Sequence, residues 1–244
     1  MTLQIEKRLA AVFCITTALG LAACDNDNDR PPPPPPPPAM ASFDVSVTNL
    51  TNAQPLSPVA VIAHQDGFAV FAIGAPASAA LEELAEGGDN SALLAAADAD
   101  GAVVTSGSGM APVGPAGSET VTIELLESDL PDLRVSVSSM LVNTNDAITG
   151  ANSVTVGDMA VGDSLSVYGT AYDAGTEANT EAAIHIPGPA GGGEGFNAAR
   201  DDRADQVSMH GGVVSQDDGL ATSDLSGQHR FDNPVVRISI SRTD

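Results

Sequence analysis

Apolar and polar residues alternate in several stretches between residues 42 and 244, and this pattern predicts β-strands. Alternation with a period of two puts the apolar side chains on one face, as in a half-buried strand. Two denser apolar runs predict strands that are buried on both faces. The alternating stretches are 42–50, 119–125, 133–141, 163–172 and 234–242, the dense runs are 59–63 and 68–73, and shorter strands are expected at 102–105 and 153–156.

The period changes between residues 78 and 97, where two short helices are expected. Leu81 and Leu84 lie three residues apart, and Ser78 is placed to cap the first helix. Gly87 and Gly88 are expected to end it. A second helical stretch covers 91–97. Both are expected to be insertions that pack on a sheet.

These elements predict an all-β domain over residues 42–244, an antiparallel β-sandwich of about eight strands with one or two short inserted helices. About two hundred residues suit one such domain. Aromatic residues make up only 3% of the chain and tryptophan is absent. The core is therefore expected to consist mainly of aliphatic side chains.

The N-terminus is typical of a bacterial secretion signal over residues 1–23. Lys7 and Arg8 form the positive region, and residues 9–23 form an apolar stretch shorter than the roughly 20 residues of a spanning helix. Small residues precede Cys24, and the segment 21–24 resembles a bacterial lipobox. In a lipobox the cysteine is lipidated and becomes the mature N-terminus. We therefore expect a protein anchored by lipid in the bacterial cell envelope, at either its periplasmic or its cell-surface face.

Residues 24–41 are expected to tether the domain to the membrane. Prolines occupy 31–38 without interruption, which predicts a polyproline II spacer of roughly 25 Å. The two cysteines, Cys14 and Cys24, both lie near the N-terminus, so the domain has no thiol for a disulfide or a nucleophile.

The charge balance of the chain argues against nucleic acid as a partner. The chain has 32 Asp and Glu against 9 Lys and Arg, for a net charge of −23. Such a surface repels nucleic acid and attracts cations.

A loop over 172–181 has the chemistry of a cation site. It follows a predicted strand and carries three carboxylates, an amide and two hydroxyls around Gly175. Calcium takes six to eight oxygen ligands from chains that turn sharply. A second oxygen-rich turn lies at 143–146. The alternative is a solvated acidic loop in an acidic protein.

Several short stretches, in order along the domain, resemble the spondin N-terminal domain family in a cysteine-free form. They are 47–51, 56–58, His64, 74–78, 84–89, 144–146 and 173–177. The resemblance implies a β-sandwich similar to the membrane-binding C2 architecture. Animal members of the family belong to extracellular-matrix adhesion proteins and carry a calcium ion.

Matching the family's motifs residue by residue implies one calcium ion held by Asp146, Asp173 and Glu177. We expect three further residues to contact these ligands without binding the ion themselves: Asn145, Asn179 and Glu181. The chain departs from the family at two points: Ala147 stands where the animal pattern has tryptophan, and Glu177 stands where it has aspartate.

Catalytic motifs are weak by comparison. The four histidines show no zinc spacing, no nucleophile elbow is present, and the few aromatic residues do not suit a glycosidase. His64, at the end of a buried strand, is expected to be a hydrogen-bonded structural residue.

We therefore expect a non-catalytic, calcium-binding adhesion or interaction lipoprotein whose partner is an extracellular or periplasmic protein or a glycan. Two alternatives stay open. One is a metal-assisted envelope hydrolase that uses the same carboxylates with His64 or His210, and the other is a passive surface lipoprotein without a metal.

Overall fold

The computed structural model describes residues 34–199 and 205–244, of which Pro38–Asp244 form one compact unit. The predicted signal peptide (1–23) and lipid site (Cys24) lie outside the described residues. Residues 34–39 are exposed and have no regular structure, and the first strand begins at Met40. In the part of the chain that the structure describes, no helix is long and apolar enough to cross a membrane.

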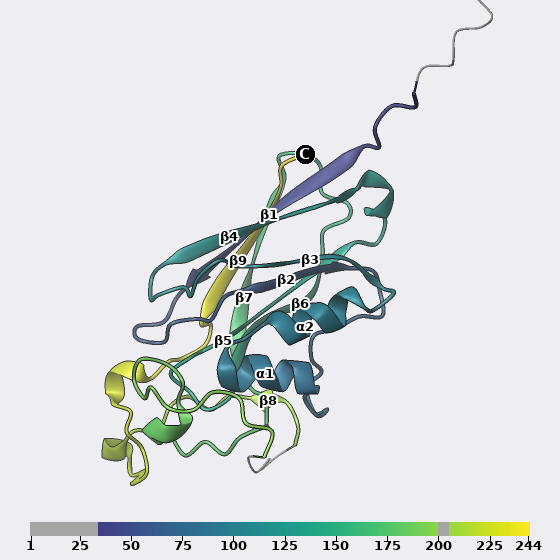
Figure 1. The fold of residues 1–244 in the computed structure, drawn as a ribbon. Helices are drawn as coiled ribbons and strands as arrows, with labels where there is room; N and C mark the ends of the chain where they lie inside the picture. The colour runs from purple at the N-terminus through teal and green to yellow at the C-terminus, as the bar shows by residue number, and fades with distance from the viewer. Residues whose placement is uncertain (1–33, 200–204) are drawn as a thin grey trace, which may run out of the picture. The chain divides into compact units, whose positions relative to one another are not determined.

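In the described residues, nine antiparallel strands form the sheet, in the order β3-β2-β5-β6-β7-β9-β1-β4, with β8 paired to β7 (Figure 1). They are β1 (Met40–Asn49), β2 (Ala60–His64), β3 (Val103–Ser108), β4 (Ser118–Leu126), β5 (Arg134–Met140), β6 (Ala147–Thr155), β7 (Ser164–Asp173), β8 (Ser208–Met209) and β9 (Val236–Arg242). Two α-helices, α1 (Ala79–Gly87) and α2 (Ser91–Asp98), lie between β2 and β3 in the described chain. Single 3-10 turns occupy Glu127–Asp129, Ala183–His185, Gln216–Asp218 and Gly227–His229.

Strand β7 belongs to both halves of this sheet. Its first residues pair with β9, and its last residues pair with β6 and β8. The two edge strands, β3 and β4, also approach each other: a Cβ on Gly107 of β3 would lie 3.0 Å from the side chain of Val121 of β4. The sheet is thus nearly barrel-like, and the predicted all-β, sandwich-like fold is confirmed.

The main core fills the space between the two halves. Phe43 and Val45 of β1, Val61 of β2 and Ile238 and Ile240 of β9 are completely buried there. These residues alternate with polar ones on β1 and β9, so the period-two pattern of the sequence marks the inward face.

A second core lies between β2 and the two helices. Ile62 of β2 and Ile148 of β6 pack with Leu81 and Leu84 of α1. Strand β2 is consequently covered on both sides, since Val61 faces the main core while Ile62 lies under α1. This double coverage explains its nearly continuous apolar sequence.

Helix α1 begins and ends where the sequence predicts. The hydroxyl of Ser78 accepts a hydrogen bond from the Leu81 amide at 3.2 Å, and Gly88 ends the helix in the left-handed conformation, at φ 72°. A side-chain acceptor at this position satisfies an amide that the helix itself leaves without a partner.

Replacing Ser78 with alanine should therefore destabilise the domain by about 1 kcal/mol. For a domain of this size, that loss corresponds to a fall in melting temperature of about 2–4 °C. Thermal unfolding followed by circular dichroism would measure it. Ser78→Asp is the control, because aspartate also caps, and equal melting of Ser78→Ala and wild type would show that the cap contributes nothing.

Two expectations about strands need correction, and one short strand was missed. Residues 68–73 do not form a strand: the side chain of Asn152 accepts a hydrogen bond from Val70 N (3.0 Å) and donates one to Phe71 O (3.0 Å), in place of a ladder. The short strand expected at 153–156 is the end of the longer β6. The two-residue strand β8 was not expected.

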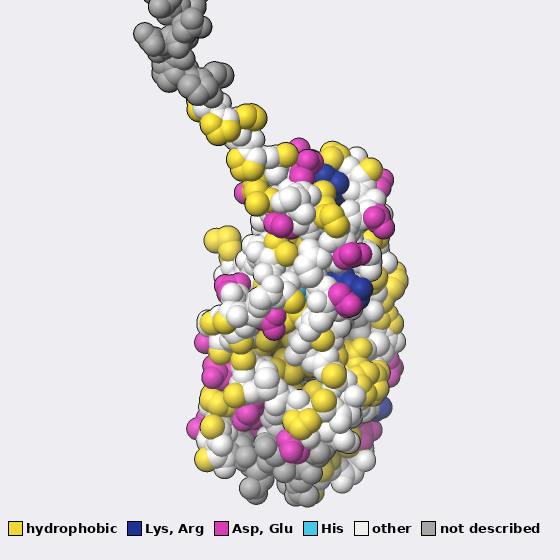
Figure 2. Space-filling model, turned by 90° about the vertical axis from the view of Figure 1, so that its right-hand side faces the viewer, with side chains coloured by type: hydrophobic (Ala, Val, Ile, Leu, Met, Phe, Trp, Pro, Cys, Tyr) yellow, Lys and Arg dark blue, Asp and Glu magenta, His cyan; other side chains and the backbone are white. Residues whose placement is uncertain are grey.

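Acidic side chains are scattered over the molecular face drawn in Figure 2, and few basic ones accompany them. This distribution agrees with the net charge of −23. It favours cationic ligands over anionic ones.

Candidate metal centre

The three predicted calcium ligands lie on two segments that meet at one end of the sheet. Asp146 directly precedes β6, and Asp173 is the last residue of β7. The pairing of Ala147 with Asp173 brings the two segments together, and Ala174 N donates a hydrogen bond to Asp146 O at 3.2 Å. Glu177 follows in the loop after β7. The structure thus places the acidic turn at 143–146 beside the acidic loop at 172–181.

The carboxylate of Asp146 holds this loop in place. Asp146 is completely buried, and its Oδ2 accepts hydrogen bonds from the backbone amides of Thr176 (2.8 Å) and Glu177 (3.1 Å). Its other oxygen, Oδ1, is buried and has no hydrogen-bond partner in the part of the chain that the structure describes. Because a buried anionic oxygen without a partner is costly, this atom needs a proton, a water or a cation.

The turn after β7 depends on Gly175. Its φ is 73°, and a Cβ there would collide with the backbone oxygen of Gln206. Glycine is therefore required for both the conformation and the close approach. Asp173 closes the turn, since its Oδ1 accepts from Gly175 N at 2.8 Å and its Oδ2 accepts from Asn179 Nδ2 at 2.6 Å. The side chain of Asn179 thus holds the carboxylate of Asp173 by this hydrogen bond.

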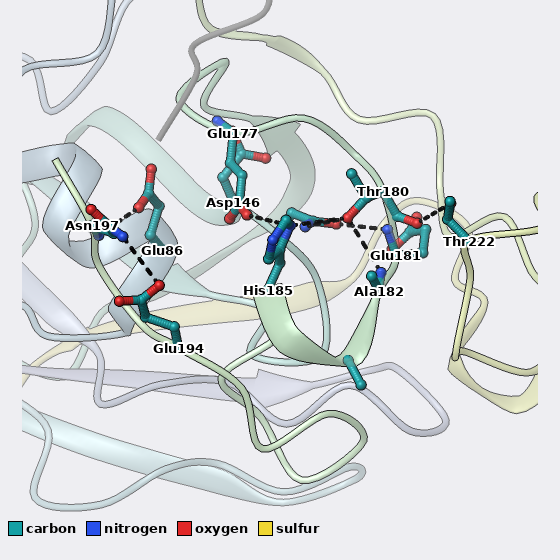
Figure 3. A network of polar contacts seen from close by, with 12 residues as sticks. Glu86, Asp146, Glu177, Thr180, Glu181, Ala182, His185, Glu194, Asn197 and Thr222 are labelled. Atoms are coloured by element: carbon teal, nitrogen blue, oxygen red, sulfur yellow. Dashed lines mark hydrogen bonds and ion pairs between the residues drawn. The ribbon is translucent and has the colours of Figure 1, made fainter. Parts of the chain in front are cut away.

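Glu177 points to a histidine that the sequence did not single out. Its Oε1 lies 3.2 Å from His185 Nδ1, and Thr180 Oγ1 lies at the same distance from that nitrogen. Figure 3 shows His185 beside Glu177, with Thr180 continuing the network toward Thr222. No spacing pattern marks His185, because its approach to Glu177 depends on the path of the loop.

Glu181 has more of a ligand's character than the sequence suggested. It is buried, and its φ of 55° lies in the left-handed region, which is uncommon for a residue with a side chain. Its Oε1 accepts a hydrogen bond from Val214 N at 3.3 Å, whereas its Oε2 is buried and finds no partner among the described residues. Asn145 supports it, because Glu181 N donates to Asn145 Oδ1 at 3.1 Å.

Burial makes ionisation of two of these carboxyls unfavourable. It raises the pKa of Asp146 to about 7, an effect reinforced by the charge of Asp173 and partly opposed by the amides of Thr176 and Glu177. Burial also raises the pKa of Glu181 to about 7, with a smaller contribution in the same direction from Asp173. A divalent cation would favour the charged form of both groups.

The remaining histidines are engaged in other ways. His64 is completely buried; its Nδ1 lies 2.7 Å from Gln65 O and its Nε2 lies 2.8 Å from Ser136 Oγ. The carbonyl requires a proton on Nδ1, so Nε2 accepts from the serine. The expectation of a hydrogen-bonded structural residue is confirmed for His64.

His210 has the opposite tautomer. Gly212 N donates to its Nδ1 at 2.9 Å, which places the proton of the neutral ring on Nε2. Burial lowers the pKa of His210, so the ring is neutral. Nε2 is buried without a partner and is a donor. In this tautomer, neither nitrogen of His210 is available to bind a metal or to act as a general base.

His185 does not complete a catalytic triad either. In such a triad the nucleophile and the carboxylate contact different ring nitrogens, so that the ring can take a proton from one side while it is held from the other. Here Glu177 and Thr180 both approach Nδ1. The arrangement orients the ring but does not connect the two groups through it.

A pocket of about 410 Å³ borders the acidic loop. Asp173, Glu177, Asn179 and Thr180 line it from the loop side, and Leu220 and Thr222 from a later segment. The carboxylates of this loop do not converge on one point. In residues 34–199 and 205–244, no three His, Cys, Asp or Glu side chains are placed so that they could share an ion. An ion would have to draw them together.

Comparison with known proteins adds no further guide to this site. The chain matches no family model, and no curated protein matches it.

Proposed function

We propose that this chain is a lipid-anchored envelope protein whose spondin-like β-sandwich binds one calcium ion and serves in adhesion or interaction rather than catalysis. The observation that carries the proposal is the completely buried carboxylate of Asp146, whose Oδ1 has no hydrogen-bond partner within residues 34–199 and 205–244. It lies against the loop that contains Asp173 and Glu177.

The donor set favours calcium among the common metals. Among the described residues, Asp146 Oδ1 and Glu181 Oε2 are buried oxygens without hydrogen-bond partners, and each oxygen of Asp173 accepts one hydrogen bond, which leaves further lone pairs. Calcium binds such oxygens in flexible arrangements, whereas zinc and copper prefer nitrogen or sulfur. We therefore add Glu181 to Asp146, Asp173 and Glu177 as a ligand.

An ion at this point would join two loops of the sandwich. Asp146 precedes β6, while the other three carboxylates end or follow β7. The domain has no cysteine, so such a tie would supply a cross-link that a disulfide cannot. An ion bound there would supply positive charge, while Asp146 and Gly175 fix the position of the loop.

The anchor is proposed from the sequence of residues 1–24. Lys7 and Arg8, the apolar stretch and Cys24 have the order of a lipoprotein signal. The tether at 24–41 would then separate the domain from the membrane, where it is available to a protein or glycan partner.

A metal-assisted hydrolase is the second candidate, favoured by the pocket beside Asp173 and Glu177. The histidines weigh against it. His64 is hydrogen-bonded elsewhere, His210 has a tautomer that cannot accept a proton at Nε2, and His185 is not among the residues that line this pocket.

Calcium titration of residues 38–244 by isothermal calorimetry tests the proposal. We expect about one ion per chain, with binding at least about tenfold weaker in Asp173→Asn, a loss of about 1.4 kcal/mol. Glu124→Gln removes an exposed carboxylate from β4, remote from this loop, and should bind as wild type does. Absence of calcium binding would overturn the calcium proposal and leave the passive surface lipoprotein.

A further inference from the structure

A second pocket, which we call the loop groove, lies where short stretches at 52–55, 115, 143, 189–190 and 228–229 meet. Its volume of about 500 Å³ falls within the range of about 300–1,000 Å³ that is usual for small-ligand sites. The stretch 52–55 follows the end of β1, whose ten residues span about 33 Å from Met40. The groove is therefore remote from the point where the chain enters the domain, and a partner can reach it there.

Two buried amide side chains hold the walls of the loop groove together. Gln54 is completely buried; its Nε2 donates to Asn143 O (3.2 Å) and His229 O (2.8 Å), and its Oε1 accepts from Asn143 N at 3.1 Å. Asn143 is also buried; its Nδ2 donates to Ala53 O and its Oδ1 accepts from Ala190 N, both at 2.9 Å. Connected networks of buried polar groups are rigid, so the groove is preformed.

The loop groove carries no formal charge among its described lining residues. None of them is Asp, Glu, Lys or Arg, although the whole chain has a net charge of −23. Burial lowers the pKa of His229, so this ring is neutral at pH 7. An anionic ligand would be repelled by the surrounding protein, and a cationic ligand would find no carboxylate in the groove. The groove therefore suits an uncharged ligand.

Amide groups supply the hydrogen-bonding capacity of the groove. Asn52 and Gln228 are exposed, and each side-chain amide has two N–H donors and a carbonyl acceptor. Asn52 uses one N–H on Gln228 O at 3.2 Å, which leaves its other N–H and its oxygen for a ligand. Pro55, Pro189 and Ala53 add apolar contacts, but none of the described lining residues is Phe, Tyr or Trp. A plain sugar ring would thus lack a platform to stack on, whereas an acetamido group brings its own planar amide and methyl.

We propose that the loop groove binds an uncharged saccharide that carries N-acetyl groups. The amide of Asn52 would pair with the N–H and C=O of an acetamido group, whose methyl would contact Pro55 and Ala53, and the amide of Gln228 would hydrogen-bond a ring hydroxyl. The inference rests on the adhesion or interaction role proposed above and names its partner as a glycan. It uses none of the proposed calcium ligands, since none of them lines this groove.

An NMR titration of ¹⁵N-labelled residues 38–244 with N,N′,N″-triacetylchitotriose, in EGTA, tests the inference on the compact unit of the chain. We expect saturable shifts of the backbone amide signals of Ala53 and Ala190 and of the side-chain NH₂ signals of Asn52 and Gln228. Cellotriose has the same linkage but carries hydroxyls in place of the acetamido groups. It should bind at least about tenfold more weakly.

Matched glutamine variants locate the binding in the groove. Gln228→Ala should weaken binding about three- to tenfold, the usual effect of losing one hydrogen bond. Asn52 donates to the backbone oxygen of Gln228, so this contact is kept. Gln216→Ala also removes an exposed glutamine from a 3-10 turn, but Gln216 is not among the lining residues and the variant should bind as wild type does. Ala53→Leu fills part of the groove and should weaken binding at least about tenfold.

Each outcome is separate from the test of the calcium site. Absence of triacetylchitotriose binding, equal binding of cellotriose, or shifts confined to residues 173–181 would overturn the saccharide inference and leave the calcium proposal standing. Shifts of the groove signals with the uncharged peptide acetyl-Ala-Pro-Ala-amide, and with neither sugar, would assign the groove to a protein partner and would also overturn it. Sugar binding by a protein that shows no calcium binding in calorimetry would support the inference and overturn only the calcium proposal.

Discussion

Calcium at about 100 times its dissociation constant is expected to raise the melting temperature of this protein by about 5–10 °C. Binding to the folded state alone adds about 2.7 kcal/mol at that concentration. A domain of this length gains about 2–4 °C for each kcal/mol. Asp146 Oδ1 and Glu181 Oε2, which are buried and have no hydrogen-bond partner among the described residues, are the oxygens expected to bind the ion. Scanning calorimetry with calcium and then with chelator would measure it.

Asp146→Asn should abolish this calcium response without unfolding the loop. The asparagine oxygen can still accept from the amides of Thr176 and Glu177, but the negative charge is lost. Asp146→Ala differs, because it removes the acceptor and leaves two buried amides that each cost about 1–3 kcal/mol. Glu124→Gln, on the exposed face of β4, should keep the full shift. A full calcium shift in Asp146→Asn would show that this carboxylate does not bind the ion.

Strands with one solvated face were predictable because alternation reports burial directly. The prediction at 42–50 coincides closely with β1, in which every second residue is buried. The start of β6 was missed, since Ala147, Ile148, Thr149 and Gly150 are all buried and do not alternate. Residues 68–73 were mistaken for a strand because a dense apolar run also occurs where a loop covers a core.

The site was predictable only where its contacts are local or follow from neighbouring strands. The turn at Gly175 is visible in the sequence, and this glycine has a φ of 73° in the structure. The approach of Asp146 to the loop follows from the pairing of β6 with β7. By contrast, the amide that hydrogen-bonds the carboxylate of Glu181 belongs to Val214, 33 residues away. The segment that brings Val214 there has no periodic pattern, so sequence reasoning gave Glu181 a supporting role.

Without calcium, the stability of this protein is expected to fall as pH rises from about 4 to about 7. The pKa values of Asp146 and Glu181 rise from 3.8 and 4.5 in the unfolded chain to about 7 in the folded one. Between these limits the folded state binds more protons than the unfolded state, so their contribution is complete below pH 4 and is lost as pH passes through 7. At 1.36 kcal/mol per pKa unit, the loss is on the order of 4 kcal/mol for one such group.

Asp146→Asn isolates this contribution from the other carboxyls. Hydrogen bonds to Ser91 and Ser215 lower the pKa values of Asp89 and Asp218, which gives the opposite pH dependence, but these groups are unchanged in the variant. In metal-free buffer, urea unfolding between pH 5 and 8 measures the free energy of unfolding of both proteins. The value for the variant should rise relative to that of the wild type as pH rises, because asparagine does not ionise. With saturating calcium the order should reverse, since the ion stabilises only the charged aspartate. Equal pH dependence of the two proteins in metal-free buffer would mean that Asp146 ionises in the folded state at no cost, and that burial alone does not prepare this site for a cation.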